Sequence, residues 1–232
     1  IYVDLCNPDY EVVRITASGW EITKEPSVRF VRGAGAEPLP KPERTGAGFA
    51  DLKRLMNCKE DEDFCMLTAF LVGCFSFGTP YPILCLQGAP GTGKSTKTVM
   101  IKRLTDPNQA DHRGTPESVR DLMISARQQH VLAYDNISEI TQWLSDAFCR
   151  LSTGAGFSKR AHYSDSEEII FKAKRPIILN GIEDIHAQKH DLTSRAISVV
   201  GLTTTFRSAA IAWPSVAVCM TLIRAAARPT TT

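Results

Sequence analysis

The sequence has no cysteine pattern that would hold a metal ion or a set of disulfides. None of its seven cysteines forms a C-x-x-C pair, and several lie in apolar runs, where a free cysteine behaves as a small hydrophobic residue. We therefore expect neither a zinc site nor a disulfide framework. Free cysteines of this kind indicate a reducing compartment such as the cytoplasm.

A membrane-spanning run and a strong net charge are also missing. The apolar stretch at residues 64–77 is too short to cross a bilayer, so we expect a buried helix there and no membrane partner. The net charge is only +2, so any binding of nucleic acid must depend on local patches. The chain begins at Ile1 and has no signal-peptide pattern, and we expect it to be a piece of a longer protein.

What the chain does contain is a phosphate-binding loop between an apolar strand and a helical stretch. The strand at residues 83–86 leads into the pattern G-x-x-x-x-G-K-S at residues 88–95. Glycines let the backbone curl so that N–H groups point at phosphate oxygens, and the helix that opens near Lys94 adds the positive end of its dipole. We predict that Lys94 reaches the β- and γ-phosphates of ATP and that Ser95 ligates Mg²⁺. The predicted nucleotide-binding residues are Gly88, Ala89, Pro90, Gly91, Thr92, Gly93, Lys94, Ser95 and Thr96.

A second apolar strand, at residues 131–136, ends in an acidic residue. After a phosphate-binding loop this is the Walker B pattern, in which Asp135 helps to hold Mg²⁺, usually through water. Many P-loop ATPases follow this aspartate with a glutamate that polarises the attacking water, whereas here Asn136 follows it. An amide orients water but is a poor base, which leaves the rate of hydrolysis open. Glu139 is an alternative base, although a solvated surface position suits it better.

Two further polar residues accompany later core strands. Asn180 ends the apolar run at residues 176–179, where a polar side chain beside Walker B can contact the γ-phosphate or its water. Arg195 precedes an apolar run at residues 196–202, where ring-forming ATPases present an arginine finger to the neighbouring subunit; a surface ion pair is the other interpretation. The predicted catalytic residues are Lys94, Asp135, Asn136, Asn180 and Arg195.

The pattern as a whole predicts an α/β fold, a P-loop core with a parallel sheet, preceded by a small β-rich segment. We divide the chain into a β-rich segment and Pro/Gly linker (1–48), a helical segment (49–80), the P-loop core (81–205) and a partly helical tail (206–232). Predicted strands in the first segment are 2–5, 11–15, 20–22 and 28–32. Predicted helices are 50–56, 61–77, 96–104, 116–129 with Thr115 as N-cap, 138–151 and 209–227. Residues 152–174 are expected to form a hairpin, with a turn at 164–166 and a returning strand at 168–174.

These motifs, taken in order, resemble the ATPase domain of virus- and phage-encoded primase–helicases of superfamily 3, within the AAA+ class. The likeness is strongest to phage and integrative-element proteins with Asp-Asn at Walker B and Asn-Gly-Ile after the sensor strand, and it covers roughly residues 1–202. The residues that carry it are the P-loop, Asp135, Asn136, Leu151, Lys159, Arg160, Tyr163, Asn180, Gly181, Ile182 and Arg195.

The resemblance implies a homo-oligomeric ring, a hexamer, in the cytoplasm of a bacterial host cell. ATP turnover would then drive movement along single-stranded or forked DNA during replication of a phage or mobile genetic element. The hairpin would project into the central channel, where four cations would contact the DNA backbone; taken alone, these cations fit a solvated hairpin face equally well. The four are Lys159, Arg160, Lys172 and Lys174.

We keep a second function open beside the ATP-dependent DNA helicase or translocase. The chain would then be a nucleotide-gated module that loads onto DNA and turns ATP over slowly, which Asn136 and the modest net charge favour. A P-loop kinase of a small substrate fits poorly, because it leaves Arg195 and the hairpin without a role.

Overall fold

A four-stranded parallel sheet forms the centre of the molecule in the computed structural model, which describes residues 1–43, 48–58, 60–160, 168–181 and 189–199. Its strands are β4 (Ile83–Gln87), β5 (Leu132–Ile137), β8 (Ile177–Gly181) and β9 (Ala196–Val199). They lie in the order β5-β8-β4-β9, so that the strand before the glycine-rich loop has a neighbour on each side. The predicted α/β fold with a parallel sheet is confirmed.

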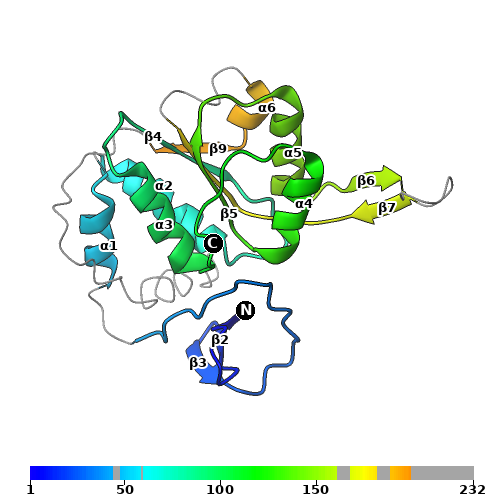
Figure 1. Ribbon diagram of the computed structural model, residues 1–232. Helices are drawn as coiled ribbons and strands as arrows, with labels where there is room; N and C mark the ends of the chain where they lie inside the picture. Colours follow the sequence, from blue (N-terminus) through cyan, green and yellow to red (C-terminus); the bar gives the residue numbers. More distant parts are fainter. Residues whose placement is uncertain (44–47, 59, 161–167, 182–188, 200–232) are drawn as a thin grey trace, which may run out of the picture.

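Helices cover both faces of this sheet because alternate side chains of β4 point to opposite sides. The helices are α1 (Gly48–Met56), α2 (Asp61–Gly73), α3 (Lys94–Thr105), α4 (Val119–Gln128), α5 (Gln142–Thr153) and α6 (His190–Thr193). Leu84 and Leu86 pack into one hydrophobic cluster with α1, α2 and α3, whereas Ile83 and Cys85 pack into another with α4 and α5 (Figure 1). Burial on both faces explains why β4 reads as an unbroken apolar run.

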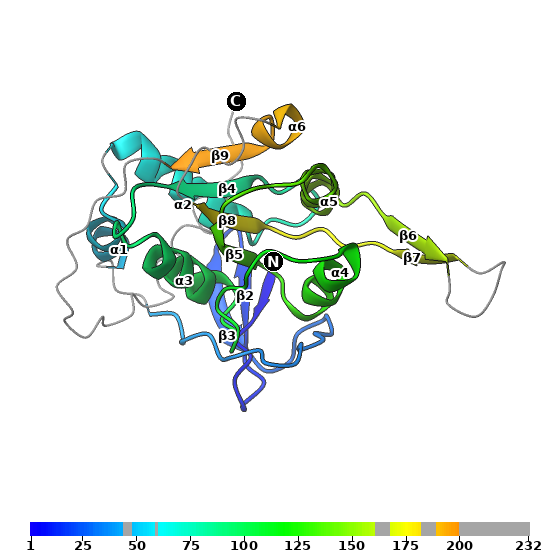
Figure 2. The ribbon, with the colours of Figure 1, turned by 45° about the horizontal axis from the view of Figure 1, so that its top comes forward.

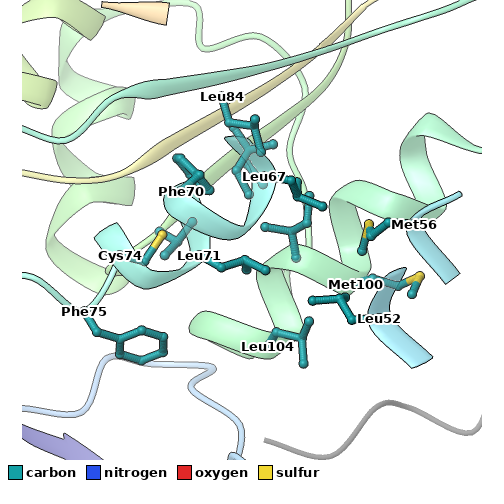
Figure 3. Packing of buried hydrophobic residues seen from close by; sticks show 14 of the residues in the cluster. Leu52, Met56, Leu67, Phe70, Leu71, Cys74, Phe75, Leu84, Met100 and Leu104 are labelled. Carbon is teal, nitrogen blue, oxygen red and sulfur yellow. The ribbon is translucent and has the colours of Figure 1, made fainter. Parts of the chain in front are cut away.

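The first cluster joins three helices to the sheet. Figure 3 shows side chains of α1, α2 and α3 gathered below Leu84 of β4, among them Leu52, Leu67, Phe70 and Met100. Each such side chain contributes about 1.5–3 kcal/mol by its burial. Helix α2 is the buried helix expected from residues 64–77, but it ends at Gly73, where the Cys74 N–H donates to carbonyls of its last turn. In the described part of the chain, no helix is long and apolar enough to cross a membrane.

A small antiparallel sheet precedes the core, as predicted, and packs against it. Its strands are β1 (Tyr2–Asp4), β2 (Val12–Thr16) and β3 (Gly19–Thr23), in the order β1-β2-β3. The predicted fourth strand at residues 28–32 is wrong. That stretch is held by a side chain instead of a strand ladder, since Arg32 donates to the Asp4 carboxylate through Nε and Nη2, both at 2.8 Å, and to the Asn7 carbonyl at 2.9 Å.

The Pro- and Gly-rich stretch that follows fastens this small sheet to the core. The Glu37 N–H donates to the Pro107 carbonyl at 3.0 Å, and the Gln109 N–H donates to the Gly35 carbonyl at 2.8 Å. Leu39 is 6% exposed and belongs to the same hydrophobic cluster as β1, β2 and the core helices. Figure 2 shows β2 and β3 lying below the four-stranded sheet and α3. The small sheet and the core therefore share one hydrophobic interior.

Gly33 is the position at which this attachment is tightest, and replacing it with alanine tests it. A Cβ on Gly33 would lie 2.1 Å from the backbone oxygen of Gln128 at the end of α4, so something must shift. We expect Gly33→Ala to lower the free energy of unfolding by about 1–3 kcal/mol in a urea titration, the usual cost of overpacking. Gly73→Ala is the control, because a Cβ there meets nothing within 4 Å, and it should leave stability equal or slightly higher. Equal stability of the two variants would contradict the observed packing.

Two helices begin later than predicted, for different reasons. Helix α4 begins after Ser118, whose hydroxyl accepts from the Asp121 N–H at 3.2 Å, so the predicted cap at Thr115 is wrong. Helix α5 begins after Thr141 instead of near residue 138, because β5 continues to Ile137 and the chain needs several residues to turn. Short α6 was not predicted.

The predicted hairpin is confirmed and projects away from the body of the molecule (Figure 1). It consists of β6 (Phe157–Arg160) and β7 (Glu168–Phe171), paired antiparallel. Strand β7 stops at Phe171, short of the predicted residue 174, as the chain turns into the core. There the Arg175 side chain donates to the carbonyls of Ala126 and Gln129 at 2.8 and 3.0 Å. The predicted turn at 164–166 and the helix at 209–227 lie outside the described residues.

Candidate nucleotide site

The glycine-rich loop leaves the carboxyl end of β4 and runs directly into α3, as predicted. Gly91 and Gly93 have φ angles of 80° and 75°, a left-handed conformation that side chains disfavour. A Cβ at either position would meet nothing within 4 Å, so the backbone angle and not the space requires glycine. The Thr92 hydroxyl braces the loop by donating to the Ala89 carbonyl at 2.9 Å. A curled loop at a helix N-terminus is an arrangement that binds phosphate.

The Lys94 side chain folds back into this loop. Its Nζ donates to the carbonyls of Gly88 and Ala89 at 2.7 and 2.9 Å. Lys94 is 8% exposed, and burial lowers the pKa of its ammonium group, an effect that the Asp135 carboxylate partly offsets. A phosphate in the loop would offer this ammonium a full negative charge in place of two carbonyl dipoles. The position therefore suits a phosphate ligand.

Asp135 comes next to the loop at the carboxyl end of β5. The Ser95 hydroxyl donates to Asp135 Oδ1 at 3.1 Å. The pairing of β5 with β8 shifts register between Tyr134 and Ile137, so Asp135 leaves the regular ladder. Bulges of this kind re-aim side chains beside functional sites. Hydroxyl and carboxylate oxygens are ligands that Mg²⁺ prefers, so Ser95 and Asp135 together fit a magnesium ion.

Asn136 and Asn180 both lie near the carboxyl ends of their strands, but Asn136 is exposed and Asn180 is buried. Asn136 is exposed, has a left-handed φ of 55°, and donates its backbone N–H to Asp135 Oδ1 at 2.8 Å. Asn180 is 1% exposed, and its Nδ2 donates to Thr98 Oγ1 on α3 at 3.2 Å. The predicted contact of Asn180 with a γ-phosphate or its water stays a prediction. Glu139 is exposed, which agrees with the interpretation that it is a solvated surface residue.

Arg195 lies at the amino ends of the strands, whereas the loop follows the carboxyl end of β4. Its carbonyl accepts from the N–H of Ile83, the first residue of β4, and its Nη1 donates to the Asp191 carbonyl at 2.7 Å. Strand β4 has five residues, and at about 3.3 Å a residue the loop begins about 16 Å further along. The structure thus separates Arg195 from the residues around Lys94 in its own chain.

The four predicted DNA-contacting cations do not lie together on one element. Lys159 and Arg160 belong to β6 of the projecting hairpin, whereas Lys172 and Lys174 follow β7. Lys172 is exposed, and Lys174 Nζ lies 5.8 Å from the centre of the Tyr81 ring. Their contact with DNA stays a prediction.

His112 lies beside Asp135 and was not predicted from the sequence. Its Nε2 lies 3.4 Å from Asp135 Oδ2. The chain next to it runs along the outer edge of β5, where the Arg113 N–H donates to the Ala133 carbonyl at 3.0 Å and the Asp135 N–H donates to the Arg113 carbonyl at 2.9 Å. No periodic pattern in residues 108–116 signalled this pairing, because it is a single bridge.

A comparison with protein families identifies the chain. Residues 49–223 match the model of a family described as the actinomycete integrative conjugative element replication protein. The chain belongs to this family. The part that matches the replication-protein model contains the whole loop, together with His112, Asp135, Asn180 and Arg195, whereas β1, β2 and β3 precede it. A comparison with curated proteins gives no match.

Several solved structures are similar to this chain at low sequence identity. An apo C-terminal region of NrS-1 has a TM-score of 0.47 and 12% identity, covering 82% of this replication protein and 45% of that chain. A structure described as "SCCmec type IV Cch - active helicase" has a TM-score of 0.48 and 12% identity, covering 97% and 43%. The JCV helicase bound to a small molecule has a TM-score of 0.43 and 12% identity, covering 76% and 53%. The chain spans about half the length of these proteins.

Proposed function

We propose that this replication protein is the ATPase domain of a superfamily 3 (AAA+) DNA helicase or translocase, with its core in residues 81–205. It would move along single-stranded or forked DNA during replication of the integrative element, in the cytoplasm of the bacterial host. The observation that carries the proposal is the 3.1 Å contact of Ser95 with Asp135 at the start of the helix that carries Lys94. Phosphoryl transfer depends mostly on positioning and charge stabilisation, which these three side chains can supply.

Each residue of the site has a distinct proposed role. Residues 88–96 bind the phosphates of ATP through backbone N–H groups, and Lys94 compensates the charge of the β- and γ-phosphates. Ser95 and Asp135 would hold Mg²⁺, which would supply positive charge against the negative charge that develops in phosphoryl transfer. Asn180, together with Asn136, orients the attacking water.

The position of Arg195 supports a ring in which neighbouring subunits complete each other's sites. Arg195 lies beside the first residue of β4, and the loop of its own chain begins about 16 Å further along that strand, so Arg195 would serve the γ-phosphate of the adjacent subunit. In a closed ring, which we propose is a hexamer, every loop would have a neighbouring subunit that offers its Arg195. The projecting β6–β7 hairpin would then reach into the channel and contact the DNA backbone through Lys159 and Arg160, with Lys172 and Lys174 at its base.

A nucleotide-gated module that loads onto DNA and turns ATP over slowly is the second candidate. Asn136 favours it, because an amide stands where many P-loop ATPases carry a catalytic glutamate. The same phosphate and metal contacts would then serve mainly as a switch. Directional strand displacement by the full-length protein separates the two functions.

The test is the steady-state ATPase rate as a function of protein concentration, with and without single-stranded DNA, at low and moderate salt. We expect the rate per subunit to rise steeply with concentration, because Arg195 acts across an interface. We also expect DNA to stimulate the rate and salt to weaken the stimulation, because the DNA contacts are with phosphates. A low rate that neither DNA nor concentration alters would favour the loading module.

A further inference from the structure

We propose that His112 is a positioning residue for Asp135, holding one carboxylate oxygen so that the other faces Ser95 and the metal. The proposal deepens the proposed ATPase site and rests on it. It begins from one contact, the 3.4 Å between His112 Nε2 and Asp135 Oδ2.

The Asp135 carboxylate needs support on both oxygens to keep a fixed plane. Its Oδ1 accepts from the Ser95 hydroxyl at 3.1 Å and from the Asn136 N–H at 2.8 Å, whereas Oδ2 faces His112. The last torsion of an aspartate side chain is broad, so bonds to one oxygen alone leave the carboxylate free to rock. A ring N–H at Oδ2 fixes the plane, and neutral imidazole is sufficient because one of its nitrogens is a donor.

Both residues next to His112 are anchored to the elements that build the site, Arg113 through its backbone and Asp111 through its side chain. Arg113 pairs with β5 through two hydrogen bonds, of 3.0 and 2.9 Å, to Ala133 and Asp135. On the other side, the Asp111 carboxylate accepts from Arg103 of α3, through Nε at 2.9 Å and Nη2 at 2.7 Å. The same helix carries Lys94 and Ser95, so His112 is held from the strand and the helix that supply the proposed metal ligands.

The simpler explanation is that the half-exposed His112 lies near Asp135 by chance at the protein surface. An exposed pair of this kind contributes little to stability, and nothing requires the backbone beside it to be fixed. In metal sites, by contrast, residues that orient the ligands are held in place, and removing one costs about 10–100-fold in metal affinity or activity. The 3.4 Å separation is long for a hydrogen bond, and hydrogen bonds in catalytic sites often tighten when the substrate binds.

The experiment compares His112→Ala with His112→Gln in the whole chain, and Glu117→Ala is the matched control because it is exposed in the same α3–α4 connection. Two quantities are measured: the Mg²⁺ dependence of ATP turnover, and Mn²⁺ affinity in the presence of a non-hydrolysable ATP analogue. We expect His112→Ala to weaken Mn²⁺ affinity and lower kcat by about tenfold, with KM for ATP nearly unchanged. The glutamine variant should recover most of both losses because its amide keeps an N–H donor.

Two outcomes would overturn the proposal while leaving the proposed function standing. One is wild-type metal affinity and kcat in His112→Ala. The other is equal impairment of the alanine and glutamine variants, since a lost donor would then not be the cause. If the wild-type chain binds the analogue without turning ATP over, Mn²⁺ affinity alone decides. A wild-type chain that binds no nucleotide would overturn the proposed function and this inference together.

Discussion

Replacing Lys94 with alanine should abolish ATP turnover while leaving the fold intact. The loop encloses the Lys94 ammonium group, which donates to the Gly88 and Ala89 carbonyls. Removing a preorganised charge of this kind from a transition-state site costs about a hundredfold to a thousandfold in rate. The measurement is the steady-state ATPase rate, together with binding of a fluorescent ATP analogue, which should also weaken.

The control for this variant is Lys24→Ala, which removes a lysine that directly follows β3. Lys24 is 62% exposed and lies 3.9 Å from Asp9, so its removal should change neither turnover nor stability. Thermal melts of both variants should resemble the wild type, because Lys94 is already desolvated and its removal leaves no buried charge behind. An unchanged rate in Lys94→Ala, in a preparation free of contaminating ATPase, would contradict the assignment of the loop as the ATP-binding site.

Replacing Arg195 with alanine should also abolish ATP turnover, although Arg195 lies far from the loop in its own chain. An arginine finger is worth about 10³-fold or more in phosphoryl transfer, and it can come from a neighbouring subunit. In the free chain Arg195 Nη1 donates to the Asp191 carbonyl at 2.7 Å and to Ser194 Oγ at 3.2 Å, which holds it close to its own helix α6. Arg120→Ala, on the exposed side of α4, is the control and should keep the wild-type rate.

Mixing the two inactive variants distinguishes action within a subunit from action between subunits. A subunit with Arg195→Ala keeps an intact loop, and a Lys94→Ala neighbour keeps an intact Arg195. Where these two meet in the right order, one complete site forms, and part of the activity should return in a mixed ring. Sedimentation analysis would first confirm that mixed assemblies form. If they form and no activity returns, Arg195 does not act in trans.

The candidate site illustrates which parts of its arrangement a sequence can predict. The loop and Asp135 were predictable because each follows a short apolar strand, and because the backbone geometry needs glycine at Gly91 and Gly93. The hairpin was predictable from two strand-like runs on either side of a polar turn. These signals are local, since they depend on periodicity and on the angles that single residues adopt.

Other features could not be predicted because they depend on contacts between distant parts of the chain. His112 reaches Asp135 only because Arg113 pairs with the outer edge of β5. The expected strand at residues 28–32 failed because a bidentate Arg32–Asp4 pair outcompetes strand pairing there. The cap of α4 is Ser118 instead of Thr115, which depended on which hydroxyl could reach a free N–H.

By itself, the sequence determined the order along the chain of the strands of the parallel sheet and the residue types of the loop after β4, since both follow from local pattern. Only the tertiary structure decided that the small sheet shares the hydrophobic interior of the core, that Asn180 donates to Thr98, and that Arg195 lies at the other end of β4 from its own loop. The physical reason is the same in each case. Strand register and side-chain packing depend on contacts along the whole chain. The local pattern of a sequence does not show which distant segments come into contact.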